Sequence, residues 1–257
     1  MTILRETEQP RAPIFSPTHL DSLRSRSDVP NDTWYLVVAT ALCILNRPED
    51  IQTVYTHAVG AGHAPVGVPN GVALPDKEQQ RIARRIREAL LKVSAIGGLP
   101  KTINALQELK KVVPAHLSDE PEAETTTAPI LARGRAFFDK CYGKVAQRVM
   151  SSLDHCGTED LGLAVRLTYG YVLSPTTILS EAETSFVMIA GLIPQDVNPQ
   201  LKGHLKGALN GGAGVAQVRA VRQVAIDVCE AAGMKVLSSK DGAAGGGWGW
   251  RSPVQDL

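Results

Sequence analysis

Residues 181 to 212 constrain the fold most, because an apolar segment is broken by prolines and followed by an amphipathic helix. The segment from Phe186 to Ile193 is long enough for about two buried helical turns. Pro194 and Pro199 then interrupt it, since proline lacks an N–H group and disfavours helix in the residue before it. The following helix places on one face Leu201, His204, Leu205, Ala208 and Leu209. We therefore predict a buried helical hairpin with His204 as the only titratable group on its inner face.

The same pattern occurs a second time, in residues 33 to 62. There an apolar helix is followed by Pro48 and by a helix that carries His57. The helices that come next also match, and the acidic position of the later copy is occupied by Leu36 in the earlier one. No segment has a convincing strand pattern. The sequence therefore predicts an all-α fold with two pseudo-repeated helical hairpin units, of which the first is degenerate.

Shifts in composition divide the chain further. The expected segments are a disordered arm at 1–15, the degenerate first unit at 16–112, a linker at 113–129, the second unit at 130–238 and a Gly/Trp-rich tail at 239–257. The linker is acidic and then rich in threonine, which is typical of segments without a packed core. The tail is either mobile or docked through Trp248 and Trp250.

Charge and hydropathy exclude several classes of partner. The net charge of +1 gives no reason to expect a nucleic acid, and no apolar run approaches the ~20 residues of a membrane span. The first residues lack a signal-peptide core, and the last three are not an SKL-type address. None of the four cysteines forms a Cys-x-x-Cys pair, which favours a reducing compartment. We expect a cytoplasmic protein, with an organelle matrix as the alternative.

The sequence predicts neither a metal nor a cofactor. Its six histidines form no His-x-x-x-His or Glu-x-x-His pair, which are the usual spacings for metal ligands on a helix. The glycine run at 245–247 follows no strand and opens no helix, so it does not have the context of a phosphate-binding loop.

The 181–212 stretch resembles the signature of the carboxymuconolactone decarboxylase family. The residues that carry the resemblance are Glu183, Leu201, His204, Ala208, Leu209, Asn210 and Gly212. The approach from Tyr169 to Glu183 is also similar, and the resemblance covers roughly 134 to 235 well. It implies the helical alkylhydroperoxidase D-like fold and association into closed rings, so we expect a homo-oligomer, with a trimer favoured.

The resemblance implies a cofactor-free lyase or isomerase that acts on a small carboxylated lactone or an enolisable acid. In that role His204 polarises a carbonyl or donates a proton, and Glu183 orients His204 or acts as the acid. Arg166 or Arg222 would hold a substrate carboxylate, and Tyr169 or Tyr142 would donate a hydrogen bond to it. Asn210 completes the expected substrate-binding set. Val197 and Gln200 occupy the positions of the cysteine pair of the related dithiol peroxidases, so we expect no such peroxidase activity.

Two hypotheses therefore compete: an enzyme of this family, and a non-catalytic oligomeric scaffold that has lost the site. The retention of Glu183, His204 and Asn210 favours the enzyme. The interval of 21 residues from Glu183 to His204, about two longer than the family spacing, favours the scaffold. On residue type alone, His204 is more often a core histidine, and Arg166 and Arg222 are more often members of salt bridges. Whether Glu183 and His204 share a pocket depends on the tertiary structure.

Overall fold

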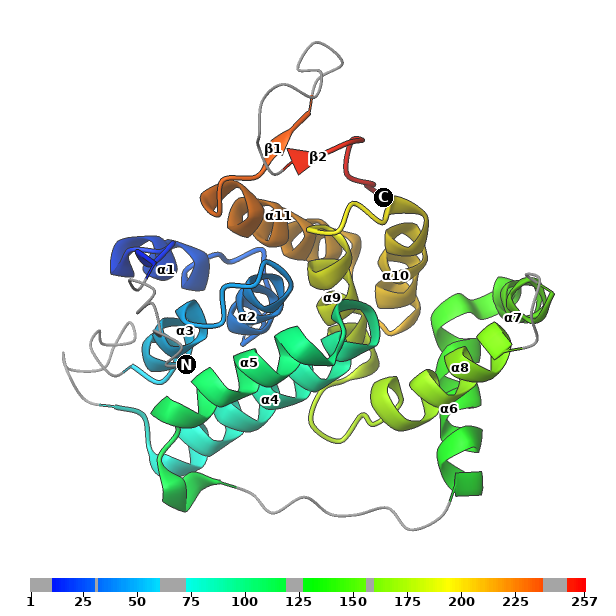
Figure 1. The fold of residues 1–257 in the computed structure, drawn as a ribbon, viewed down its shortest axis with the longest axis horizontal. Helices are drawn as coiled ribbons and strands as arrows, with labels where there is room; N and C mark the ends of the chain where they lie inside the picture. Colours follow the sequence, from blue (N-terminus) through cyan, green and yellow to red (C-terminus); the bar gives the residue numbers. More distant parts are fainter. Residues whose placement is uncertain (1–10, 31, 61–72, 119–126, 156–159, 238–248) are drawn as a thin grey trace, which may run out of the picture.

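A computed structural model describes residues 11–30, 32–60, 73–118, 127–155, 160–237 and 249–257 (Figure 1). These residues are mostly helical, which confirms the expected all-α fold. The strands within the described ranges are the two-residue β1 (Lys235–Val236) and β2 (Gly249–Trp250), which pair in parallel. No helix in these ranges is both long enough and apolar enough to cross a membrane.

The first half of the chain forms a group of helices around α2. Its elements are α1 (Pro17–Arg24), α2 (Trp34–Ile44), α3 (Asp50–Ala58), α4 (Asp76–Gly97), α5 (Leu99–Val112) and the short 3-10 turn η1 (Ala115–Leu117). Helix α4 begins with two acidic residues, Asp76 and Glu78, which interact favourably with the helix dipole. Helices α4 and α5 pack side by side along the lower edge of the molecule in Figure 1.

The second half contains a three-helix group and a second hairpin. Its elements are α6 (Thr127–Tyr142), the 3-10 turn η2 (Gly143–Val145), α7 (Ala146–Asp154), α8 (Asp160–Thr168), the π-helical turn η3 (Tyr169–Leu173), α9 (Glu181–Leu192), α10 (Asn198–Asn210) and α11 (Val215–Ala231). Helices α6, α7 and α8 lie together at the right of Figure 1, and α6 packs against α10.

Helices α2 and α9 form the centre of the core. All of α2 is buried, as is α9 from Thr184 to Leu192. Neither of these segments contains a charged residue, so each must be covered on every side. The two helices pack against each other, and α4 and α11 each pack against both of them (Figure 1). The two expected hairpins are therefore joined through their apolar first helices.

The two hairpins turn with the same backbone geometry. Asn46 follows α2 with a φ of 55°, and Asp196 follows α9 with the same φ of 55°. Asparagine and aspartate tolerate this left-handed conformation better than other side chains do. In each turn the next residue donates its N–H group back to the apolar helix, from Arg47 to Leu42 and from Val197 to Leu192.

The expected segment boundaries need correction where the chain packs against the core. Phe15 is buried, so residues 11–15 do not belong to a disordered arm, while 1–10 lie outside the described residues. The expected linker at 113–129 contains the turn η1, in which Leu117 is buried, and α6 already begins at Thr127. These differences arise because single apolar side chains anchor segments whose average composition is polar.

The last residues dock on the second hairpin. Trp250 is completely buried, and its indole Nε1 donates a hydrogen bond of 2.8 Å to the carbonyl oxygen of Ile193. The backbone N–H group of Arg251 donates to Asp196, and that of Gln255 donates to Asn198. Of the two outcomes expected for the tail, residues 249–257 therefore take the docked one, while Trp248 lies outside the described residues.

A close backbone approach holds α6 against η3. A Cβ atom added at Gly134 would lie 2.5 Å from the Cα atom of Gly170, so a side chain at this position could not fit. Glycine allows the two segments to touch. The contact fixes Tyr169, the residue before Gly170, beside the aromatic side chains of α6.

Candidate functional site

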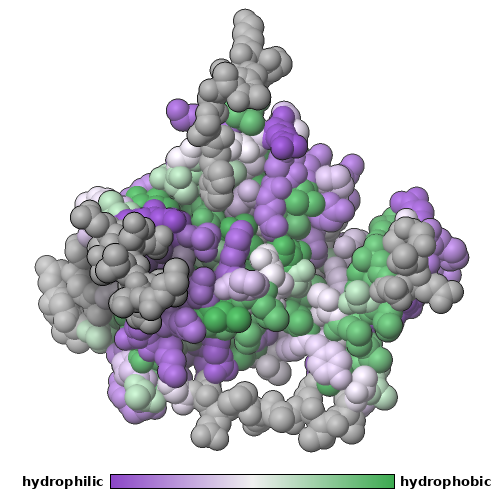
Figure 2. Space-filling model, in the orientation of Figure 1, coloured by the Kyte–Doolittle hydropathy of each residue, from purple (hydrophilic) through white to green (hydrophobic). Residues whose placement is uncertain are grey.

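A large cleft lies between the three-helix group and the second hairpin, and we call it the α6–α10 cleft. Its volume is about 1030 Å³, and its walls are mostly apolar. Apolar side chains in its walls include Ile96, Phe138, Val149, Val165, Leu173 and Met188. Figure 2 shows hydrophobic residues gathered over α6–α8, at the right of the molecule. The cleft combines residues from α4, α6, α7, α8, α9 and α10.

His204 lies in the wall of this cleft, on α10. Its side chain is buried, and burial lowers its pKa to about 4, so the imidazole is neutral near pH 7. Its Nδ1 atom is buried and has no hydrogen-bond partner within the described residues. The ring of Tyr142 lies edge-on to the imidazole, with the ring centres 6.4 Å apart. His204 is therefore a neutral polar group held in apolar surroundings.

The histidine of the first hairpin has different neighbours. The Nε2 atom of His57 lies 2.9 Å from a carboxylate oxygen of Asp21, and its ring packs edge-on against Trp34. Helix α1 supplies this carboxylate, whereas α6 supplies Tyr142 to His204. In the first hairpin the histidine thus has an acidic partner, whereas in the second hairpin the histidine lies in the wall of the cleft.

Two tyrosine hydroxyl groups meet near His204. The hydroxyl of Tyr169 donates to that of Tyr142 across 3.3 Å, and both rings pack against Phe138. Burial raises the pKa of Tyr142 and raises that of Tyr169 well above its ordinary value. Both phenols are therefore neutral near pH 7, and they can donate and accept hydrogen bonds but not act as bases.

Asn210 and Cys141 complete the polar part of the wall. The side-chain amide of Asn210 donates to the backbone carbonyl of Cys141 at 2.8 Å, which ties the end of α10 to α6. Burial raises the pKa of the Cys141 thiol to about 11, so it is not a thiolate near pH 7. Of the seven expected site residues, four line the cleft: Tyr142, Tyr169, His204 and Asn210.

Glu183 does not line the cleft. Its side chain closes a capping box with Ser180 at the start of α9, and Arg85 of α4 donates a 2.5 Å hydrogen bond to it. Burial acts to raise the pKa of Glu183, but the bonds from Arg85 and Ser180 outweigh burial and lower it. Met188 does line the cleft. Because five residues correspond to a rotation of roughly 140° on a helix, Glu183 and Met188 lie on different faces.

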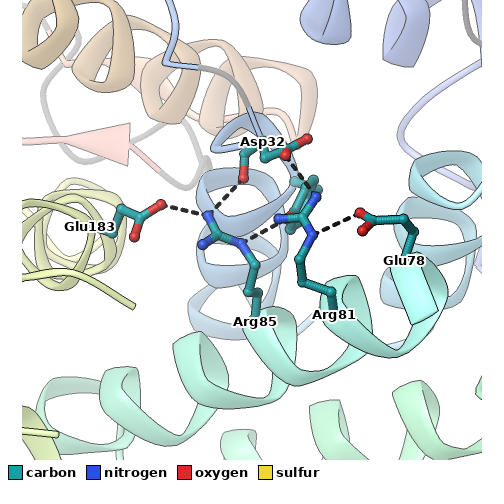
Figure 3. Close-up of polar contacts among 6 residues, drawn as sticks. Asp32, Glu78, Arg81, Arg85 and Glu183 are labelled. Atoms are coloured by element: carbon teal, nitrogen blue, oxygen red, sulfur yellow. Dashed lines mark hydrogen bonds and ion pairs between the residues drawn. The ribbon is translucent and has the colours of Figure 1, made fainter. Parts of the chain in front are cut away.

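Figure 3 shows the network that holds Glu183. Arg85 also donates to the hydroxyl group of Tyr35 at 2.9 Å and to the backbone carbonyl of Asp32 at 3.0 Å. The neighbouring Arg81 bridges the carboxylates of Asp32 and Glu78. The network thus ties the beginnings of α2 and α9 to α4. The expected pairing of Glu183 with His204 is not present, because the acid is bound on the side of α9 that faces α4.

The two arginines expected to hold a substrate carboxylate are bound elsewhere. Arg166 of α8 forms two hydrogen bonds, of 2.7 and 2.6 Å, with the carboxylate of Asp154 on α7. Arg222 of α11 donates to the backbone carbonyls of Val254 and Gln255 and so holds the docked C-terminal residues. Neither arginine lines the cleft.

Four cations at the cleft were not identified from the sequence as site residues. They are Lys144, Arg148, Lys202 and Lys206. The helical periodicity of α10 placed Lys202 and Lys206 on the face opposite Leu201, but it could not show which element covers that face. Lys144 and Arg148 are four residues apart across the start of α7. Residues at this spacing lie on the same face of a helix, so the sequence could have indicated that the two side chains point the same way.

The chain is similar to proteins of two yeasts. It is 35% identical over 226 residues to Peroxisomal protein 2 of Schizosaccharomyces pombe, which covers 86% of this chain and 91% of that protein. It is 30% identical over 251 residues to Peroxisomal protein 2 of Saccharomyces cerevisiae, which covers 78% of this chain and 89% of that protein. No family model matches the chain.

These similarities correct the functional part of the sequence analysis. The identification with the carboxymuconolactone decarboxylase family is wrong, because relatives over most of the chain are named Peroxisomal protein 2. The lyase or isomerase activity that rested on this identification is wrong with it. The alternative of a scaffold that has lost its site is not clearly favoured by the relatives either.

Replacement of Glu183 tests whether this carboxylate is structural. Glu183→Ala removes the capping box and leaves the guanidinium of Arg85 without its carboxylate partner, so we expect the free energy of unfolding to fall by about 2–4 kcal/mol in urea denaturation. Glu181→Ala, two residues earlier on α9, breaks a more exposed pair with Lys140 and should cost less than about 1 kcal/mol. Equal losses in the two variants would contradict the structural role of the network.

The buried neutral imidazole predicts a pH dependence of stability. The pKa of His204 falls from 6.5 to about 4 on folding, so below pH 6.5 the unfolded chain takes up a proton that the folded chain does not. The stability contributed by the neutral ring is complete above pH 6.5 and declines as the pH falls towards 4. Relative to His204→Gln, the wild-type protein should lose about 2 kcal/mol between pH 7.5 and pH 5. If urea denaturation showed the same change in the free energy of unfolding for both proteins between these pH values, the prediction would be wrong.

Proposed function

We propose that this chain, which belongs to the Peroxisomal protein 2 family, binds a small, largely apolar molecule in the α6–α10 cleft. The observation that carries this proposal is the mostly apolar cleft with the buried, neutral His204 in its wall. A bound apolar ligand would cover these walls and remove them from water.

The size and composition of the cleft support a ligand. Clefts that hold small molecules usually measure about 300–1000 Å³ and combine apolar walls with a few polar groups. The α6–α10 cleft lies at the upper end of this range, with a volume of about 1030 Å³. Each square ångström of apolar surface that a ligand removes from water contributes roughly 25 cal/mol. The ligand that fits best is therefore large enough to cover several apolar side chains.

The protonation states of the polar groups favour binding over acid–base catalysis. A general acid or base works best when its pKa lies near the working pH. Burial lowers the pKa of His204 to about 4 and raises those of Tyr142 and Tyr169, so none of the three is well placed to transfer a proton near pH 7. As neutral groups they can still donate and accept hydrogen bonds, and so can fix the orientation of a ligand.

The tautomer of His204 follows from its surroundings. A neutral imidazole carries one proton, and a proton on the buried Nδ1 would be an enclosed donor without an acceptor. The proton therefore belongs on Nε2, and this N–H group is the one with which the ring can donate a hydrogen bond to a ligand. The hydroxyl groups of Tyr142 and Tyr169 provide further polar contacts in the same wall.

A blocked cleft provides the test. Ala164 lines the cleft from α8 and is exposed, so Ala164→Trp should fill the space without disturbing the core. Ala136 is an exposed residue of α6 that does not line the cleft, so Ala136→Trp is the matched control. We expect the neutral dye Nile red to bind the wild-type protein and the control equally, and to bind the blocked variant at least ~10-fold more weakly, about 1.4 kcal/mol. No binding, or equal binding by all three, would refute the proposal.

We further propose a peroxisomal location in place of the cytoplasmic location expected from the sequence. The support is the name of the relatives, which are called Peroxisomal protein 2 in both yeasts. A fluorescently tagged full-length chain should coincide with a peroxisomal marker under the microscope. Uniform fluorescence of the cytoplasm would favour the original expectation.

The expected homo-oligomer, with a trimer favoured, stays a prediction. Exposed apolar side chains on α8 and η3, among them Leu163, Leu167 and Tyr171, are consistent with a subunit contact.

A further inference from the structure

Among the described residues that line the α6–α10 cleft, four cations are not balanced by acidic groups. Lys144 belongs to η2, Arg148 to α7, and Lys202 and Lys206 to α10, so they come from three elements of the lining. No aspartate or glutamate of the described residues lines the cleft. All four side chains belong to exposed residues, and their charged ends can therefore meet an ion from solution.

None of these cations has a protein partner in the ranges that the structure describes. Nearby cations on the same group of helices are paired: Arg135 with Asp139, Lys140 with Glu181, and Arg166 with Asp154. The cations of the cleft therefore differ from these neighbouring cations in having no acidic partner among the described residues. Like charges that line one cleft repel one another, and a bound anion relieves that repulsion.

The cations and the apolar walls belong to the same cleft. Phe138, Val165 and Met188 lie in its walls, whereas the charged residues are exposed. A ligand that uses both features needs an apolar body that covers the walls and a negative group that reaches the cations. A neutral apolar molecule would leave the four cations unpaired, and a small inorganic anion would leave the walls in water.

We infer that the ligand of the α6–α10 cleft is an amphipathic carboxylate, whose hydrocarbon part covers the apolar walls and whose carboxylate is held by Lys144, Arg148, Lys202 and Lys206. This inference rests on the proposed function and names the chemical class of its ligand. Arginine can bind a carboxylate through two parallel hydrogen bonds, whereas the lysines act as point charges. The binding should weaken with salt, because the charges are exposed.

The test compares two ligands that differ in the head group alone. Decanoate and 1-decanol, each below its aggregation or solubility limit, displace Nile red from the wild-type protein. Decanoate should do so at a concentration at least ~10-fold lower than 1-decanol, and raising the NaCl concentration should reduce this difference. Equal displacement by the two ligands would overturn the inference.

A charge variant identifies the residues responsible. Lys202→Gln/Lys206→Gln should retain Nile red binding and reduce the preference for decanoate to less than about threefold. Lys77 and Lys235 are exposed lysines that do not line the cleft, so Lys77→Gln/Lys235→Gln removes the same charge elsewhere and should keep the preference. A preference that survives in the cleft variant, or that is lost equally in both variants, would contradict the assignment. Unchanged melting temperatures establish that each variant is folded.

The outcomes separate this inference from the proposed function. Failure of Nile red to bind at all would refute the proposed function and the inference together. Binding of the dye without a preference for decanoate would refute the inference alone. Leu161 of α8 is exposed and lines the cleft together with the cations, so a membrane surface is the competing partner. If vesicles containing phosphatidylserine bound the wild-type protein but not the cleft variant, and decanoate showed no preference, the cations would serve a membrane instead, and the inference would be wrong.

Discussion

The contact between α2 and α9 is the constraint on which the rest of the structure depends. Both helices are apolar over nearly their whole circumference, so each must be covered on every side. They cover each other, and α4 and α11 close over the pair from opposite sides in Figure 1. Helix α10 packs against α9, and the three-helix group then packs on α10 through α6. The cleft lies where that last group meets α10 and the end of α4.

The network around Arg85 explains why the expected pair of Glu183 and His204 is divided. Glu183 closes the capping box of α9 and accepts a hydrogen bond from Arg85. The guanidinium of Arg85 also donates to Tyr35 and to Asp32 at the start of α2 (Figure 3). The carboxylate therefore stabilises the junction of the two halves. His204 is left without an acidic neighbour, and burial keeps its ring neutral. A neutral ring in an apolar wall is suited to a hydrogen bond with a ligand and poorly suited to proton transfer near pH 7.

The chemistry of the cleft arises from segments that are far apart in the chain. Ile96 lies in the last turn of α4, Phe138 belongs to α6, and Lys202 belongs to α10. The apolar walls and the exposed cations are joined because α6, α7 and α10 meet there. The proposed ligand, an amphipathic carboxylate, follows from this combination. It does not follow from the apolar walls alone or from the cations alone.

The sequence by itself determined the features that depend on one helix or one turn. The 3.6-residue period placed His204 on the inner face of α10, and the proline breaks located both hairpins, because these relations are fixed by local geometry. It could not determine which element covers a given face. Glu183 therefore faced Arg85 instead of His204, Arg166 and Arg222 found partners outside the cleft, and Trp250 docked on Ile193. Those contacts join residues from 12 to 98 positions apart, and long-range packing of the apolar helices decides them.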